Sequence, residues 1–215
     1  MPEKLLISTA YLPPADYFSL ITKAGEVCIE AKENYIKQSY RNRCYLLSSH
    51  GSHLLSVPVY EGSRHKIPIT EIRIDHSKRW KQVHLRAIVS CYRCSPYFDF
   101  FYEPLEKIIN ADHDLLWNLN MDLLKTLLKM LKIRKMITPT DSFEAPAGET
   151  YDYRYRLEPG KEIFLHKRYL QVFSATHEFV PNLSIIDLIF NLGPDAMNYL
   201  QQMQRRGSQT RLSDK

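Results

Sequence analysis

The first 75 residues alternate short apolar runs with polar turns, and the pattern then changes to a helical period. Residues 4–12 form an apolar run that ends at two prolines, residues 15–24 carry apolar side chains at helical spacing, and residues 26–31 form a second apolar run. This order predicts strand, helix and strand. About thirty residues is the length of a βαβ unit, in which the two strands are parallel.

Three further segments of the N-terminal half read as strands. The apolar segments 43–49 and 53–60 flank a His-Gly-Ser turn, which is typical of a β-hairpin. Residues 69–75 alternate apolar and polar side chains, with Ile69, Ile72 and Ile74 as the apolar members. This segment predicts one more strand. The N-terminal half therefore supplies a sheet.

Residues 76–135 carry three stretches with helical periodicity. Ser77 is a candidate N-cap of the first helix, and Ser95 followed by proline marks the start of the second. Pro104 is expected to bend or break that second helix. The third and longest stretch, residues 115–133, is rich in leucine but contains four charged side chains. A bilayer span needs about 20 apolar residues, so we predict no membrane span.

The remainder of the chain reads as a long loop followed by two helices. Residues 138–162 are rich in turn formers and predict a loop with one strand. Ser184 and Asp187 have capping-box spacing, Gly193 can end that helix, and the proline after it can begin the next. The polar residues 203–215 predict a flexible tail.

These elements predict an α/β or α+β fold, with a mixed β-sheet from the N-terminal half, a βαβ start plus a hairpin, covered by helices. We expect a single domain over residues 1–202. Within it, residues 1–75 would mainly form the sheet, 76–135 would be helical, and 136–202 would form the loop and the C-terminal helices. A chain of 215 residues is long enough to bury such a core without disulfides or metals.

The amino-acid composition excludes only a few classes of function. The 29 basic and 24 acidic residues give a net charge of +5, too mild a balance to predict a nucleic-acid partner. The four cysteines form no zinc pattern, and the N-terminus lacks a secretion signal, so we expect reduced thiols and a cytoplasmic location. The sequence contains no P-loop, no HExxH and no serine-hydrolase elbow, so we predict no cofactor and no metal site. It does not indicate an oligomeric state.

Basic and aromatic residues gather between residues 34 and 44. On a strand, Tyr35, Lys37, Arg41 and Arg43 would share one face, and three cations on one face suit a phosphate or a carboxylate. The alternative is a solvated strand face with aromatic packing. With Asn42 beside them, these residues are the predicted binding site for a small anionic ligand.

A second candidate region combines one loop with two histidines. Tyr11 lies at the end of the first strand, and Asp16 and Tyr17 lie near the start of the following helix, where free N–H groups favour anions. The alternative is that the prolines only enforce a turn and the tyrosines pack. His84 and His177 are the candidates for proton transfer near neutral pH, although His84 lies on an apolar stripe and can equally be a core residue. Asn182 and Asp187 are candidates for orienting a substrate, and Asp187 can equally serve only its helix.

Six blocks of the chain together resemble one protein family. In order they are "AYLPPADYF", "YIKQSYRNRC", "LLSVPV", "EIRIDHSKRWKQVH", "SPYFDFFYEPL" and "FVPNLSIIDLIFNLGPDAMNYL". Their combination and spacing resemble the WbqC-like family of bacterial proteins, and the second block looks most like members from the Bacteroidetes. The resemblance covers residues 5–200.

The resemblance implies a function in surface-polysaccharide biosynthesis. It implies a transferase that attaches an acyl or glycyl group to an activated amino sugar, such as a nucleotide sugar. The alternative is a non-catalytic module that binds a small anion. The wider family pattern has Gln-Pro where this chain has Ser8 and Thr9, acidic residues where it has Ala31 and Lys32, and glycine where it has Glu178. Whether these differences change the function is left open.

Overall fold

The computed structural model describes residues 4–60, 66–143 and 150–206. Its chain begins with strand β1 (Lys4–Ser8), helix α1 (Ala15–Lys23) and strand β2 (Glu26–Glu30). The two strands are parallel, with Leu5 paired to Val27. The predicted βαβ unit is therefore confirmed.

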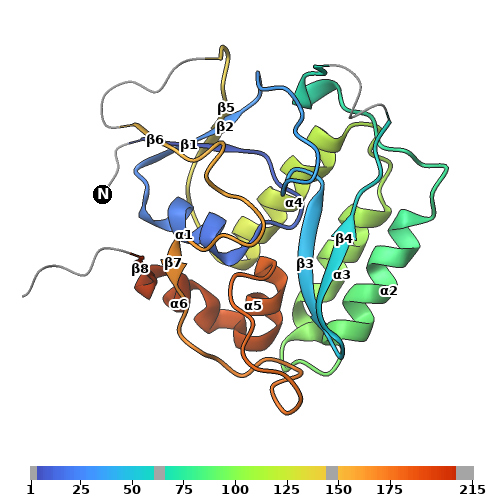
Figure 1. Cartoon of the computed structure of the whole chain (residues 1–215), viewed down its shortest axis with the longest axis vertical. Helices are drawn as coiled ribbons and strands as arrows, with labels where there is room; N and C mark the ends of the chain where they lie inside the picture. Colours follow the sequence, from blue (N-terminus) through green and yellow to red (C-terminus); the bar gives the residue numbers. More distant parts are fainter. Residues whose placement is uncertain (1–3, 61–65, 144–149, 207–215) are drawn as a thin grey trace, which may run out of the picture.

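Two short strands from later in the chain complete a four-stranded sheet. Strand β5 (Ile137–Pro139) pairs with β2, and strand β6 (Thr150–Asp152) pairs with β1, both in parallel. The order is β5-β2-β1-β6, and Figure 1 shows this sheet at one end of the molecule, beside α1. The α/β class is confirmed, but the outer strands come from the region that was predicted to be mostly loop.

The predicted hairpin is present but forms a sheet of its own. Strands β3 (Arg43–Ser48) and β4 (Gly51–Ser56) pair antiparallel with each other and not with the parallel sheet. Residues on one face of the hairpin include Arg43, Tyr45 and Ser52, because side chains alternate along each strand. Figure 1 shows the hairpin lying across the helices.

The strand predicted over residues 69–75 is wrong for its first half. A 3₁₀ turn, η1 (Ile69–Glu71), takes its place, and Arg73 and Ile74 form only isolated bridges. The amide of Ile74 donates to the carbonyl of Asp114. Isoleucine alternation here places apolar side chains against the start of α4 (Leu116–Met130), because no sheet edge is available to this segment.

The three helices predicted over residues 76–135 are confirmed as α2 (Trp80–Tyr92), α3 (Phe98–Asn110) and α4. Pro104 lies inside α3 without ending it. Ser77 does not cap α2, since its hydroxyl donates to Asp75 and the helix begins three residues later.

The C-terminal part contains helix α5 (Ile185–Leu192), the 3₁₀ turn η2 (Gly193–Asp195) and helix α6 (Ala196–Gln202). Ser184 is the N-cap residue of α5, but its hydroxyl donates to the Leu12 carbonyl and accepts no hydrogen bond from an amide N–H in the first turn of the helix. Strand β7 (Phe164–Leu165) pairs with β8 (Gln204–Arg205), so the predicted tail begins as an ordered strand. Residues 207–215 of that tail lie outside the described residues.

The parallel sheet is buried on both faces. On one face Leu5, Ile7, Val27 and Ile29 are fully buried, and on the other face Leu6 and Cys28 are buried as well, as expected for parallel strands covered on both sides. Such sheets bind ligands at the carboxyl ends of their strands. Here that edge is followed by residues 9–14 and 31–42, so the candidate site is built from these segments.

Candidate functional site

Buried charges gather where the parallel strands end. Ser8 ends β1, Glu30 ends β2, and Arg154 follows β6 by two residues. Together with Glu33, Arg41 and Asp152 they form what we call the sheet-edge cluster. The residues lie between 2 and 146 positions apart in sequence, and the fold brings them together.

Arg41 binds Glu33 through two parallel contacts. Its Nε lies 2.9 Å from Glu33 Oε1 and its Nη2 lies 2.5 Å from Glu33 Oε2. Nη2 also donates to the Ser8 hydroxyl at 2.7 Å. Both charged side chains are buried. Arg41 therefore holds two loops and the end of β1 together.

Arg154 repeats this arrangement on the other side of Ser8. Its Nη1 donates to Glu30 Oε2 at 2.7 Å, and its Nη2 donates to Asp152 Oδ2 at 2.8 Å. The Thr140 hydroxyl donates to the second Glu30 oxygen at 2.6 Å. The guanidinium also lies 4.6 Å from the ring centroid of Phe143.

The sheet-edge cluster has no excess positive charge, because two arginines face three carboxylates. Burial raises the pKa of Glu33, although its hydrogen bonds from Arg41 act in the opposite direction. These contacts favour a structural role for Arg41 over the predicted anion contact, which stays a prediction.

The strand face predicted for residues 35–43 is wrong. The chain forms turns from residue 37 to 42, and Gln38 has a positive φ of 60°. Alternation therefore does not hold: Lys37 is exposed, Arg41 is buried, and Tyr35 and Arg43 are half-buried. The predicted cations do not converge on one face, because the turns rotate them apart.

Two members of this group are placed by the hairpin. Asn42 Nδ2 donates to the Val57 carbonyl at 2.9 Å, which ties the segment to the end of β4. Arg43 lies on the same face of β3 as Tyr45. Its Nε is buried and has no hydrogen-bond partner among the described residues. Arg43 is thus a cation that the protein's own side chains leave without a full set of partners.

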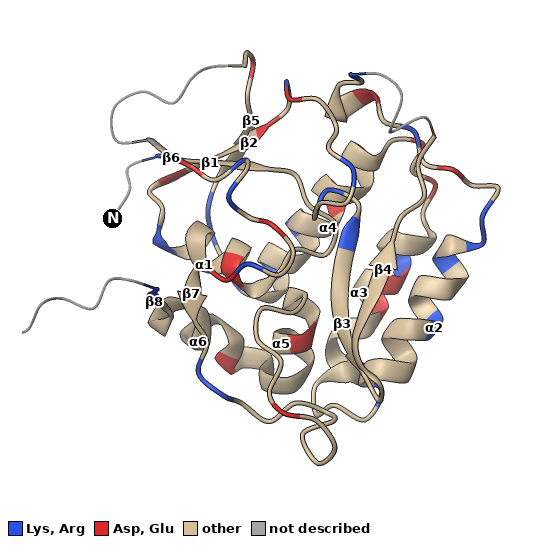
Figure 2. Ribbon diagram, in the orientation of Figure 1, with Lys and Arg blue, Asp and Glu red and all other residues tan. Residues whose placement is uncertain are grey.

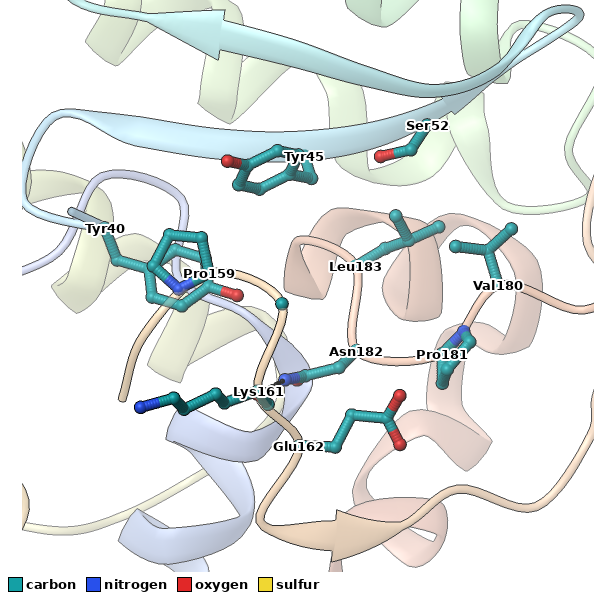
Figure 3. A pocket seen from close by; sticks show the side chains of 11 residues that line it. Tyr40, Tyr45, Ser52, Pro159, Lys161, Glu162, Val180, Pro181, Asn182 and Leu183 are labelled. Atoms are coloured by element: carbon teal, nitrogen blue, oxygen red, sulfur yellow. Dashed lines mark hydrogen bonds between the residues drawn. The ribbon is translucent and has the colours of Figure 1, made fainter. Parts of the chain in front are cut away.

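A cavity of about 420 Å³ lies beside this face of the hairpin. We call it the hairpin cavity. Its wall is formed by Tyr40, Tyr45 and Ser52 on the hairpin side, and by residues 159–162 and 180–183 on the other (Figure 3). The polar groups around it are tyrosine and serine hydroxyls, the Lys161 ammonium, the Glu162 carboxylate and an amide. Its volume is in the range of small-molecule sites.

The amide belongs to Asn182, and a buried network fixes its position. Asn182 Oδ1 accepts from the Asp16 amide at 3.0 Å, and its Nδ2 donates to Asp16 Oδ2 at 3.2 Å. Asp16 Oδ1 in turn lies 2.9 Å from His166 Nε2. Asn182 has a positive φ of 52°, a conformation that asparagine tolerates better than most residues. The cavity therefore contains a pre-positioned amide.

His177 does not line the cavity but precedes the lining residue Val180 by three positions. Its Nε2 is 2.7 Å from the Ser49 carbonyl, so this nitrogen carries the proton and donates. In the neutral ring with this tautomer, Nδ1 is a hydrogen-bond acceptor. It has no hydrogen-bond partner among the described residues. His177 is half-buried.

His84 is placed differently, in the core. Its Nδ1 lies 2.8 Å from the hydroxyl of Tyr11, and both residues are buried. Burial lowers the pKa of His84 to about 4, although a hydrogen bond to the Ser56 backbone opposes the shift. The structure does not bring His84 and His177 together. The contacts favour a packing role for Tyr11 and His84, whose predicted roles at a ligand stay predictions.

We expect His84 to make the protein less stable in acid. A histidine with a folded pKa below its unfolded value of about 6.5 contributes its full stability above that value and loses it as the pH falls. Between pH 7 and pH 5 this amounts to about 2 kcal/mol. The measurement is urea unfolding at both pH values. The His84→Gln variant should lack this part of the pH dependence, whereas the exposed-residue control His50→Gln should retain it.

Asp187 is a buried carboxylate that has no cation beside it among the described residues. Its Oδ2 accepts from the Tyr169 hydroxyl at 2.5 Å and from Gln171 Nε2 at 3.0 Å, while Oδ1 has no partner. Burial raises its pKa, against the effect of these hydrogen bonds. Figure 2 shows this acidic position in α5 and another in α1. Asp187 holds the segment 169–171 against α5, and its predicted contact with substrate stays a prediction.

No group of three or more His, Cys, Asp or Glu side chains in the described ranges is arranged to hold a metal ion. Within the same ranges, each helix is too short or too polar to cross a membrane.

The fold and cavity define an α/β protein with a small-molecule-sized cavity between an antiparallel hairpin and the segments 159–162 and 180–183. A model of the WbqC-like protein family matches residues 9–157 and 161–199, so the chain belongs to the WbqC-like protein family. The chain is also similar to the uncharacterised protein Rv1507c of Mycobacterium tuberculosis, with 26% identity over 231 aligned positions that cover 94% of this chain and 98% of that protein. No solved structure matches the chain.

Sequence reasoning missed several residues of the hairpin cavity. Lys161 and Glu162 lie in the long segment that was predicted to be loop, and His166 follows them. The signal available was the Pro-Gly turn just before Lys161, which places charged side chains at a turn. Nothing in the sequence linked His166 to Asp16, since 150 positions separate them.

Proposed function

We propose that this protein is a transferase that binds an activated amino sugar, of the nucleotide-sugar class, in the hairpin cavity. The observation that carries the proposal is the lining of that cavity. Two tyrosines offer flat, amphipathic faces, and Ser52 and Asn182 offer hydrogen bonds to sugar hydroxyls. Lys161 lines the cavity and supplies a cation for a phosphate. Arg43 does not itself line the cavity, but it lies on the same face of β3 as the lining residue Tyr45 and supplies a second cation in this proposal.

The group transferred in this proposal is an acyl or glycyl group. The amine nitrogen of the sugar attacks the carbonyl carbon of an activated acyl donor, the donor's leaving group departs, and an amide bond forms. The attacking amine must lose a proton, which His177 Nδ1 accepts. Orientation of the two reactants in the cavity supplies most of the remaining acceleration.

This function places the protein in surface-polysaccharide biosynthesis, in the cytoplasm. The four cysteines are all free thiols, which suits a reducing compartment. The proposed role in polysaccharide biosynthesis rests on what the family resemblance implies. The proposed sugar substrate rests on the residues that line the hairpin cavity.

Binding of a nucleotide sugar tests the proposal directly. We expect UDP-glucosamine to bind with 1:1 stoichiometry by calorimetry, and the double variant Arg43→Gln/Lys161→Gln to bind about tenfold more weakly, since each charged contact to phosphate is lost. Lys167→Gln is the matched control, because Lys167 is exposed, lies on the same segment and does not line the cavity.

Three outcomes separate the readings. Unchanged affinity in the double variant would contradict the hairpin cavity as the binding site. Absence of binding by UDP-glucosamine, UDP and glucosamine, in a sample with a normal unfolding transition, would contradict the sugar-nucleotide class. Binding without turnover in the presence of acyl donors would favour the non-catalytic anion-binding module.

A further inference from the structure

A second hollow lies among the helices, formed by elements that take no part in the hairpin cavity. It has a volume of about 700 Å³ and lies between α3, the C-terminal end of α4, and the η2–α6 turn. We call it the lysine groove. Its floor is apolar and includes Phe100, Phe101, Ile108, Met130 and Met197.

This floor is unusually accessible for its composition. Phe100 has 75% of its surface exposed, and the other four floor residues are only half-buried. Contiguous exposed apolar surface is typical of binding sites, whereas single exposed apolar side chains are common on any protein surface. Methionine side chains adapt their shape to an apolar partner, and two of them are present here.

The rim of the groove is basic. Lys107, Lys129 and Lys132 line it, and an adjoining hollow of about 710 Å³ adds Arg134. These four side chains form no ion pair with any residue in the described ranges, and no acidic residue lines either hollow. Glu103 lies four positions before Lys107, yet it neither lines the groove nor pairs with that lysine.

The other two cations of the adjoining hollow are already engaged. Lys125 Nζ lies 3.2 Å from Asp122 Oδ1, and Lys135 donates to the Ala24 carbonyl. Lysines in the last turn of a helix also interact favourably with the negative end of the helix dipole. This interaction explains part of the positive charge at the end of α4. That explanation does not cover Lys107, which comes from α3 and faces the same apolar floor.

We propose that the lysine groove binds an amphiphile with one acyl-type chain and an anionic head group. The chain would lie on the phenylalanine and methionine floor, and the head group would meet Lys107, Lys129 and Lys132. Charge complementarity selects an anion, since the rim offers several unpaired cations and no carboxylate. The apolar floor selects against inorganic anions and nucleic acids, which gain nothing from it. The concave shape suits one molecule better than the flat face of a bilayer.

The test uses the full-length chain and decyl phosphate below its micelle concentration, followed by calorimetry. We expect saturable 1:1 binding, and binding about tenfold weaker in Lys129→Gln/Lys132→Gln. The matched control is Lys78→Gln/Arg86→Gln, which removes the same charge from exposed positions outside the groove. Phe100→Ala should weaken decyl phosphate and decyl maltoside alike, whereas Val83→Ala, an exposed apolar control on α2, should weaken neither.

Several results would overturn the proposal. They are equal affinity for inorganic phosphate and decyl phosphate, equal losses in the groove and control variants, and binding only to anionic vesicles with none to the monomeric amphiphile. Absence of decyl phosphate binding by the folded wild-type protein would overturn it as well. None of these results bears on UDP-glucosamine, so the two proposals stand or fall separately.

Discussion

Replacing Arg41 by alanine is expected to lower the free energy of unfolding by about 3–5 kcal/mol, because it leaves the buried Glu33 carboxylate without its cation. Ser8 would lose a donor at the same time, since Arg41 Nη2 contacts both residues. Urea unfolding at pH 7 measures the change. Lys37→Ala is the control, since Lys37 lies in the same segment but is exposed, and its removal should change the free energy by less than about 0.5 kcal/mol.

The same variant should show a distinctive pH dependence. Without Arg41, only the hydrogen bond from Ser8 still lowers the pKa of Glu33, while burial continues to raise it. An acid whose folded pKa exceeds its unfolded value loses stability as the pH rises through that range. The deficit relative to wild type should therefore be smaller at pH 5 than at pH 8. Adding Glu33→Gln should recover part of the loss, because the uncompensated charge is removed.

A deficit below about 1 kcal/mol for Arg41→Ala would show that this ion pair does not form as described. A large deficit that is the same at pH 5 and pH 8 would show that packing, and not the charge of Glu33, causes the loss. The expected instability also means that Arg41 is a poor choice for a ligand-binding test, for which Arg43 and Lys161 are better suited.

Replacing His177 by glutamine is expected to reduce turnover by about 10²–10⁴-fold, the usual contribution of a positioned base. Glutamine can still donate to the Ser49 carbonyl, so the segment should keep its position. Affinity for UDP-glucosamine should change less than about twofold, which separates loss of proton transfer from loss of binding. The readout is amide formation on the amino sugar, followed by mass spectrometry.

His84→Gln is not a clean comparison for this experiment, because His84 is a core residue. His50→Gln is better, since His50 is exposed at the hairpin turn beside Ser49 and should leave turnover unchanged. A His177→Gln enzyme with wild-type turnover would assign the proton to another group. A parallel loss of binding and turnover would give His177 a positioning role.

Local patterns predicted those parts of the fold that depend on local contacts. The βαβ start, the hairpin and the helices α2 to α6 have clear periods or turn residues of their own. The outer strands β5 and β6 are three residues each, too short to show alternation. They form because β1 and β2 offer unpaired edges, which is a tertiary effect that a sequence window does not contain.

The site was predictable only to the extent that neighbours in sequence stayed neighbours in space. Asn182 lines the hairpin cavity, whereas His177 does not line it and contacts the hairpin turn at the Ser49 carbonyl. The prediction of one basic strand face was wrong because the chain turns at residues 37–42, where Gln38 has a positive φ, before it reaches Arg41 and Arg43. Arg41 contacts Ser8 at the end of β1, and Arg154 contacts Glu30 at the end of β2; only the parallel pairing brings these two strand ends to one edge.

The strand order β5-β2-β1-β6 has a consequence for synthesis on the ribosome. Strands β1 and β2 emerge early, yet β6 begins about 120 residues after β2 ends. At about 5–20 residues per second, the β1 edge of the two-stranded unit waits roughly 6–24 s for β6, and the β2 edge waits only slightly less for β5. Unpaired edges are templates for association with other chains. The nascent chain is thus most in need of a chaperone before its last third has been translated.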